Sequence, residues 1–214
     1  MRLGVGLRLC ASVPLWFVLI ILMASPTSAQ VRGFADLGVT TFTAKESVET
    51  VLGSSSGLVF GGGVEVTLPA NLFATVRASR FRADGERVFV FNGEVFNLGI
   101  PATVTITPVE FTGGYRFDRG QRTVPYVGGG VGLHRYEETS AFADDDENVK
   151  ESFTGYHVLG GVEFRATRLI ALGGEAQWTT VPDALGQDAN SVASQFDESD
   201  LGGVSFRVKV VIGR

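Results

Sequence analysis

Two histidines are the residues of this 214-residue chain best suited to chemistry. His134 and His157 are its only histidines, and each lies in a stretch where polar and apolar residues alternate. Alternate residues of a strand point to opposite faces, which places both histidines on the polar face. If the strand register pairs them, they meet with Glu137 or Glu138 nearby and could bind a metal or support hydrolysis, as in a lipid-modifying enzyme. No spacing of serine, acid and histidine matches a catalytic motif, so we expect no enzymatic activity.

Two other motifs begin like ligand-binding loops and do not complete them. The run Gly128-Gly129-Gly130-Val131-Gly132 lies inside an alternating segment, whereas a phosphate-binding fingerprint needs a strand before it and a helix after it. Residues 144–148 begin like a calcium loop, but position six is Val149 and position twelve is Gly155. An EF-hand is therefore excluded. We expect a solvated acidic loop, with a loose divalent site as the alternative, and no cofactor.

The chain begins like an exported protein. Arg2 and Arg8 precede an uncharged apolar run over 11–24, and small residues lead to a cleavage pattern at Thr27-Ser28-Ala29. The run is shorter than the about 20 apolar residues of a spanning helix. Removal of residues 1–29 takes away two arginines and no acid, which changes the net charge from −5 to −7. This acidic charge gives no electrostatic reason for binding nucleic acid.

The remaining residues, 30–214, are predicted to form one all-β domain. Short segments alternate apolar with polar residues or glycine and are bounded by turn residues, which predicts eight strands. They lie at 31–43, 58–68, 72–82, 103–117, 123–136, 152–164, 169–180 and 201–212. The connections alternate between short turns and long loops. An even number of antiparallel strands joined in this way is typical of a transmembrane up-and-down β-barrel.

One face of the predicted strands is almost free of charge. In the last strand, apolar residues occupy every second position from Val204 to Ile212, and Ser205, Arg207 and Lys209 take the other face. An outward Arg or Lys at the bilayer midplane would cost about 2–4 kcal/mol. We therefore expect the apolar face to contact lipid. The alternative is a soluble, lipocalin-like barrel with the apolar face inward and a small apolar ligand inside.

The polar face carries nearly every strand charge. Its members are Asp36, Glu65, Arg77, Glu110, Arg116, Glu163, Glu175, Arg207 and Lys209. The interior of an eight-stranded barrel is just wide enough for side chains to fill, so buried charges there need partners. The strand order places Arg77 between Glu65 and Glu110, and Arg207 between Glu175 and Asp36. We expect a packed polar core, with a gated narrow pore as the alternative.

These features together resemble a known family. The signal segment, eight alternating strands, the run Pro125-Tyr126-Val127-Gly128-Gly129-Gly130-Val131-Gly132 and the alternating last strand are similar to small outer-membrane β-barrels of the OmpA and OmpX type. The resemblance implies a protein inserted by the barrel-insertion machinery into the outer membrane of a Gram-negative bacterium. It implies structural, adhesion or surface-interaction roles without enzymatic chemistry. Such chains usually end on an aromatic residue, whereas here Ile212 takes that place before Gly213 and Arg214.

Specific contacts are expected at the rim and in the long loops. Arg80, Arg82 and Arg135 have outward parity near the loop ends, where guanidinium groups could bind the phosphates of lipopolysaccharide or simply reach the interface.

Residues 88–98 form the strongest hairpin signal, with an Asn92-Gly93 turn. Its arms are too short to span the membrane, so it should extend two strands outside. There Phe89, Phe91 and Phe96 would cap the barrel or contact an extracellular partner.

Pro108 is expected to mark a bulge, because Val104 and Ile106 differ in parity from Val109.

Overall fold

The computed structural model describes residues 30–91, 94–117, 119–140, 149–186 and 191–213. The predicted export segment and the acidic run at 144–148 lie outside these ranges. The strands are β1 (Gln30–Phe42), β2 (Ser56–Thr67), β3 (Leu72–Phe91), β4 (Glu94–Arg116), β5 (Thr123–Ser140), β6 (Val149–Arg165), β7 (Ile170–Thr180) and β8 (Gly203–Gly213). The helical elements are α2 (Lys45–Leu52), η1 (Pro69–Asn71) and α3 (Val192–Gln195). Within the described ranges, no helix is long and apolar enough to cross a membrane.

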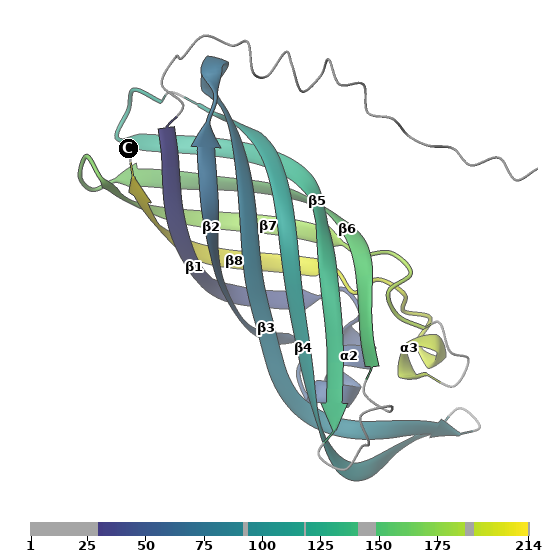
Figure 1. Ribbon diagram of the computed structural model, residues 1–214. Coiled ribbons are helices and arrows are strands. Elements are labelled where there is room, and N and C mark those ends of the chain that lie inside the picture. The colour runs from purple at the N-terminus through teal and green to yellow at the C-terminus, as the bar shows by residue number, and fades with distance from the viewer. Residues whose placement is uncertain (1–29, 92–93, 118, 141–148, 187–190, 214) are drawn as a thin grey trace, which may run out of the picture.

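The eight strands form one closed antiparallel barrel, as predicted (Figure 1). Each strand pairs with its neighbours in the chain, and β8 closes on β1 from Arg32 opposite Gly213 to Phe42 opposite Gly203. Closure gives every strand of the described barrel a partner on both sides, which a bilayer requires because it offers no water to unpaired backbone groups.

The apolar face of the barrel points outward. Val204, Phe206 and Val208 are exposed along β8, while the side chains between them are buried. The same alternation continues through β7, where Leu172 and Trp178 are exposed and Glu175 is buried. A soluble lipocalin-like barrel would have the opposite arrangement, so that alternative is wrong. The exposed apolar surface instead suits a hydrocarbon environment.

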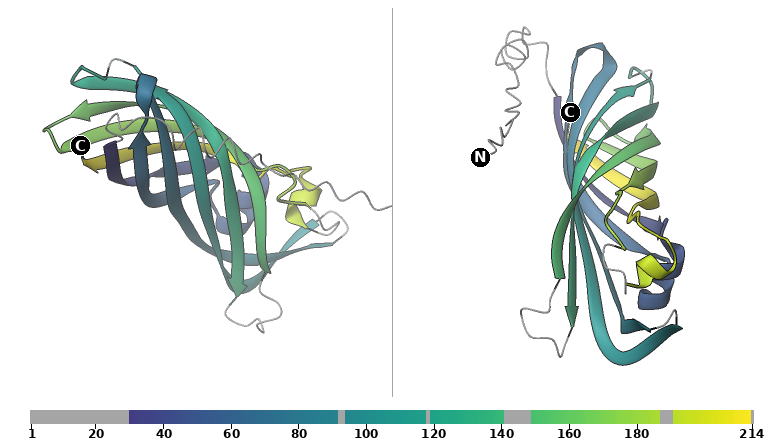
Figure 2. Two further views of the ribbon diagram at one scale, coloured as in Figure 1. Left: turned by 45° about the horizontal axis from the view of Figure 1, so that its top comes forward. Right: turned by 90° about the vertical axis from the view of Figure 1, so that its right-hand side faces the viewer.

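The two ends of the barrel differ. The short connections lie at the end that holds the start of β1 and the end of β8. The helices α2 and α3 and the tip of the β3–β4 pair gather at the other end (Figures 1 and 2). In outer-membrane barrels the short turns are periplasmic and the long loops extracellular, which orients the molecule.

The hairpin at 88–98 extends β3 and β4, as predicted, with Val88 opposite Asn97 and a register shift between Glu86 and Val88. Its predicted Asn92-Gly93 turn lies outside the described residues. The expected bulge at Pro108 is wrong. Pro108 pairs with His134 in an uninterrupted β4–β5 register. Val104 and Ile106 are buried on the inward face. The parity of the apolar residues changes because the barrel interior becomes apolar near the loops, while the strand itself stays in register.

The glycine run of β5 lets neighbouring strands approach closely. A Cβ atom added to Gly130 would collide with the backbone oxygen of Phe111 on β4. The run continues as a strand to Ser140. The run therefore allows close packing of strands and lacks the helix that a phosphate-binding loop requires.

Candidate functional site

The interior charges form two clusters, and the first lies at the periplasmic end. Arg32 contacts Glu65 at 2.5 Å and Glu163 at 2.6 Å. Arg116 contacts the same two carboxylates at 2.6 and 2.9 Å. Two guanidinium groups thus share two carboxylates, and the cluster is neutral. Arg32 was not among the predicted interior charges, although it shares the parity of Asp36 and could have been found from it.

The second cluster fills the middle of the barrel. It contains Asp36, Arg77, Glu110, Glu175, Arg207 and Lys209, all buried. Arg77 contacts Glu175 at 2.5 Å and Asp36 at 3.2 Å. Lys209 lies 3.5 Å from Glu175, and Arg207 lies 3.8 Å from Glu110. Three cations therefore face three carboxylates, and this cluster is also neutral.

The predicted pairing between neighbouring strands is only partly correct. Arg77 lies 3.9 Å from Glu110 but does not pair with Glu65, which contacts Arg32 and Arg116 instead. Within the described interior, Arg207 forms its ion pair with Glu110 and with neither of the predicted acids, Glu175 and Asp36. Its Nη1 group donates to Gln177 at 3.1 Å. Long side chains reach across the narrow interior, so partners lie on distant strands such as β3 and β7.

Aromatic rings lie between the two clusters and contact charged groups of both. The Arg116 guanidinium lies 5.2 Å from the ring centre of Phe73 and 5.1 Å from that of Tyr126. The Lys209 ammonium lies 4.6 Å from the ring centre of Tyr126. The Tyr126 hydroxyl donates to Glu175 at 2.9 Å. Cations stacked on aromatic faces are stabilised when water is excluded. The described interior is therefore a continuous packed layer of paired charges and rings.

The strand register does not pair the two histidines, which was the condition for a site between them. The register places His134 opposite Phe153 and His157 opposite Gly130. His157 Nε2 lies 2.8 Å from the Thr112 hydroxyl, and Nδ1 lies 3.7 Å from Glu110. Of the predicted acidic partners, Glu137 pairs with Arg135 and Glu138 with Tyr136. Both histidines are buried inside the barrel, below the acids. Among the described residues, no group of His, Cys, Asp or Glu is arranged to hold a metal.

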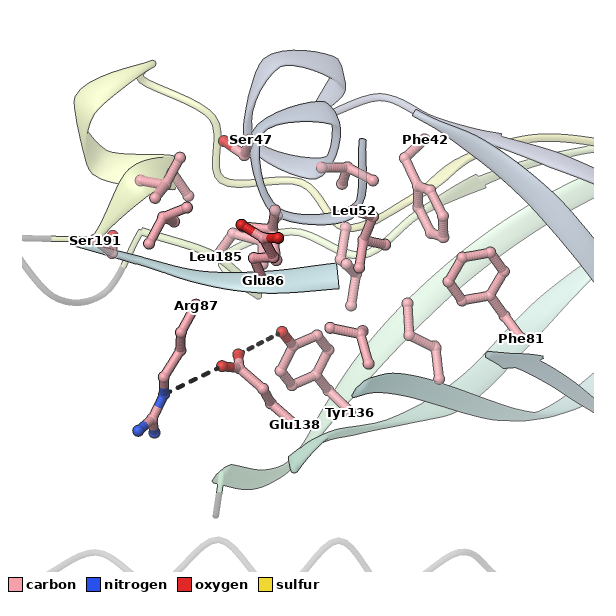
Figure 3. Close-up of a pocket in the computed structure, with 18 of the residues that line it drawn as sticks. Phe42, Ser47, Leu52, Phe81, Glu86, Arg87, Tyr136, Glu138, Leu185 and Ser191 are labelled. Atoms are coloured by element: carbon pink, nitrogen blue, oxygen red, sulfur yellow. Dashed lines mark hydrogen bonds and ion pairs between the residues drawn. The ribbon is translucent and has the colours of Figure 1, made fainter. Parts of the chain in front are cut away.

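A cavity of about 460 Å³ lies at the extracellular mouth of the barrel. Its floor is formed by inward residues of the strands, and its walls by α2, the β3–β4 extension and the segment that carries α3 (Figure 3). Most lining side chains are apolar: Phe42, Val48, Val51, Leu52, Phe81, Val88, Leu98, Val104, Ile106, Leu185, Val192, Ala193 and Leu201. The interior thus changes from charged to apolar towards the outside.

One side of the cavity is polar. The Tyr136 hydroxyl donates to Glu138 at 3.1 Å, and Arg87 Nε lies 3.9 Å from the other Glu138 oxygen. Glu86, Ser47 and Ser191 also line the cavity (Figure 3). An apolar space with a few polar groups at its edge is the usual form of a small-molecule site.

Two acidic residues after α3 hold the roof of the cavity. The Glu198 carboxylate accepts hydrogen bonds from the backbone N–H groups of Ser47 at 2.8 Å and Glu46 at 3.2 Å, at the start of α2. Asp200 accepts from the Val181 and Gly202 N–H groups at 2.7 and 2.6 Å. A carboxylate at a helix N-terminus satisfies free N–H groups and favours the helix dipole. Glu198 therefore ties the start of α2 to the segment after α3, and Asp200 holds that segment to the ends of β7 and β8.

The hairpin contributes to this cavity through residues other than the three predicted phenylalanines. Val88 and Leu98 line it, whereas Phe96 is exposed. The side chains of Phe89 and Phe91 lie outside the described part of the structure, so the predicted apolar patch is placed only at Phe96. Val88 precedes Phe89 along the strand and therefore has the opposite parity. That alternation could have identified Val88 from the sequence.

The three predicted rim arginines face outward. Arg80 and Arg82 are exposed on β3. Arg135 on β5 has 58% of its side chain exposed and lies 2.7 Å from Glu137. The residues opposite Arg82 and Arg135 are Thr105 and Thr107 of β4, so the three guanidinium groups flank one strand.

Comparisons with known proteins agree with this architecture. The family model described as outer membrane protein beta-barrel domain matches residues 15–197. Neisserial surface protein A superimposes with a TM-score of 0.55 at 12% identity, covering 86% of this chain and 97% of that one. A major outer membrane protein of Thermus thermophilus superimposes with a TM-score of 0.58 at 9% identity, covering 87% and 100%. At these identities the two structures support the fold alone.

None of the curated proteins compared with this chain matches it. The family model spans most of the chain, including seven of the eight strands. The chain therefore belongs to the outer membrane protein beta-barrel domain family, and its location is the outer membrane of a Gram-negative bacterium.

Proposed function

We propose that this protein is a surface-interaction barrel that binds the apolar part of an extracellular ligand in the cavity at its mouth. The transmembrane part is the anchor, and the paired charges inside it form a plug. The cavity lined by apolar side chains from α2, β3, β4 and the α3 segment is the observation that carries this proposal.

The size and lining of the cavity support an amphiphilic ligand. Small-molecule sites have volumes of about 300–1,000 Å³ and combine apolar walls with few polar groups; this cavity has about 460 Å³. An alkyl or aryl group would contact Val48, Leu52 and Leu185. A polar head would reach Arg87, Glu138 and Tyr136, which lie together at the edge.

The charge clusters below support binding over conduction. Each buried cation has a carboxylate within 4 Å, and both clusters are neutral. An ion entering this layer would have to separate paired charges in a low-dielectric interior, which is costly. We therefore favour a ligand that stays at the mouth, and single-channel recordings in planar bilayers should show no steady conductance.

Filling the cavity tests the proposal. The probe is a medium-chain fatty acid with an alkyl diazirine, photoactivated on the protein in lipid nanodiscs and mapped by mass spectrometry. Labelling should occur at cavity residues, and Val48→Trp, which fills the space, should lower that labelling at least about tenfold. Glu49→Trp adds the same ring on the exposed side of α2 and should have no effect.

Labelling of the lipid-facing strands provides an internal reference, because the probe also partitions into the bilayer. It should be equal in the parent and both variants. Equal cavity labelling in Val48→Trp and the parent, or labelling confined to lipid-facing residues, would exclude the ligand site.

We also propose that Arg80, Arg82 and Arg135 bind lipopolysaccharide phosphates. Their exposure on both sides of β4 near the loop end supports this role. Replacing all three with Gln should lower the lipopolysaccharide retained through purification at least about fivefold, since each surface arginine contributes about 1 kcal/mol to binding anionic lipid. Quantitative assay of co-purified lipid A measures this. Unchanged retention would discard the role and leave ordinary interfacial arginines.

A further inference from the structure

Arginines are concentrated at the periplasmic end of the barrel. Arg119 and Arg122 lie in the β4–β5 turn, Arg165 ends β6, and Arg168 lies in the β6–β7 turn. We call these four residues the basic collar. Asp118 is the only acidic residue in the sequences of the three short turns. Among the described residues, no ion pair joins a carboxylate to a collar arginine.

Contacts between the turns hold the collar together. The Arg165 N–H donates to the Arg122 carbonyl at 2.8 Å, and Arg122 Nε donates to the Arg165 carbonyl at 3.3 Å. Arg119 donates to the carbonyl of Leu68, in the short β2–β3 turn, at 3.4 Å. Partial burial and then the charges of Arg116, Arg165 and Arg32 lower the pKa of Arg119. The positive charges of neighbouring turns therefore repel one another without a counter-charge on the described surface.

The collar borders the lipid-facing surface. Arg165 and Arg168 line a cavity of about 520 Å³ at the periplasmic mouth, together with the interior residues Arg32 and Glu163 and the exposed apolar residues Leu169 and Ile170. The Arg122 guanidinium lies 5.0 Å from the ring centre of Phe164, which is exposed on the outside of β6. Aromatic residues at strand ends mark the membrane interface. Cations and lipid-facing apolar groups thus meet at the height of the headgroups.

We propose that the basic collar binds the phosphate groups of anionic phospholipids in the periplasmic leaflet of the outer membrane. The planar guanidinium group matches phosphate geometry. The lipid's acyl chains would follow the apolar outer face beside Leu169 and Ile170, which a soluble anion or a protein partner would leave uncovered. Local enrichment of anionic lipid would place negative phosphate charge beside the collar arginines.

Two tryptophan reporters on opposite ends test the proposal. Trp178 is the only tryptophan in residues 30–214 and is exposed near the extracellular end of β7. Leu169→Trp in a Trp178→Phe background places the reporter beside the collar. Both proteins are inserted into vesicles containing brominated phosphatidylglycerol or brominated phosphatidylcholine of the same chain length. Bromine quenches tryptophan on contact, so the ratio of quenching measures local preference for the anionic lipid.

The collar reporter should prefer phosphatidylglycerol about fivefold or more, the factor expected from one surface arginine. Changing all four collar arginines to Gln should reduce this preference to about one, and about 0.5 M NaCl should weaken it in the parent. The variant with Gln at Arg80, Arg82 and Arg135 is the matched control and should keep the preference at the collar reporter.

The proposal is wrong if the collar reporter shows no more preference than Trp178, or if the preference survives the fourfold substitution. If that variant does not fold, the pairs Arg119→Gln with Arg122→Gln and Arg165→Gln with Arg168→Gln should each lose part of the preference. In that case, a preference that resists both pairs and salt overturns the proposal.

Discussion

Arg77→Ala should lower the free energy of unfolding by about 3–5 kcal/mol, the usual cost of leaving a buried charge without its partner. Arg77 contacts Glu175, Asp36 and, more distantly, Glu110, and donates to Gln177 at 2.9 Å. Its removal leaves three carboxylates facing two cations in the middle of the barrel. Denaturant unfolding in phospholipid vesicles, followed by Trp178 fluorescence and by the mobility of boiled and unboiled samples, measures the change.

Arg80→Ala is the matched control for this variant. Arg80 lies three residues further along β3 and is exposed on the outer face. Removing it should change stability by about 0.5 kcal/mol or less in vesicles that lack lipopolysaccharide. If Arg77→Ala unfolds no more easily than the parent and conducts ions in planar bilayers, the packed plug is wrong and a gated pore takes its place.

Glu163→Ala should have an effect of similar size, about 3–5 kcal/mol, because it leaves two guanidinium groups with one carboxylate. Glu163 is fully buried and accepts from Arg32 at 2.6 Å and from Arg116 at 2.9 Å. The same unfolding measurement applies.

A double variant separates charge balance from packing. Glu163→Ala with Arg32→Met removes one charge of each sign and keeps the Arg116–Glu65 pair at 2.6 Å. It should be more stable than Glu163→Ala alone, since groups in one ion-pair network are not additive. Stability losses that simply add would mean that the cluster acts through packing volume and that charge neutrality contributes little.

Much of the fold could be predicted from local sequence. The period of two, the alternating connection lengths and the uncharged face of β8 identify the barrel and its outward face, because each depends on neighbouring residues alone. Pro108 shows the limit of that reasoning. An apolar residue was assumed to face lipid, so Val104 and Ile106 suggested a bulge, yet they face an interior that has become apolar.

The site was predictable in its parts and not in its contacts. Strand parity identifies the inward charges, but the pairs form across the lumen, such as Arg32 on β1 with Glu163 on β6. The cavity depends on segments far apart in the chain. Glu198 holds the start of α2 from 151 residues away, and no periodic pattern in the sequence encodes that contact.

The position of β1 has a consequence for assembly. Its two interior charges, Arg32 and Asp36, pair with β6, β2 and β3, while β8 supplies Arg207 and Lys209 to the middle cluster. A sheet that has not yet joined β1 to β8 therefore carries incompletely paired charges on both of its free strands. In hydrocarbon such a partly assembled sheet is destabilised by the unpaired backbone groups at its edges and by its unpaired charged side chains. Insertion should then be all-or-none, with closure of the β1–β8 seam as the step that commits the chain to the membrane.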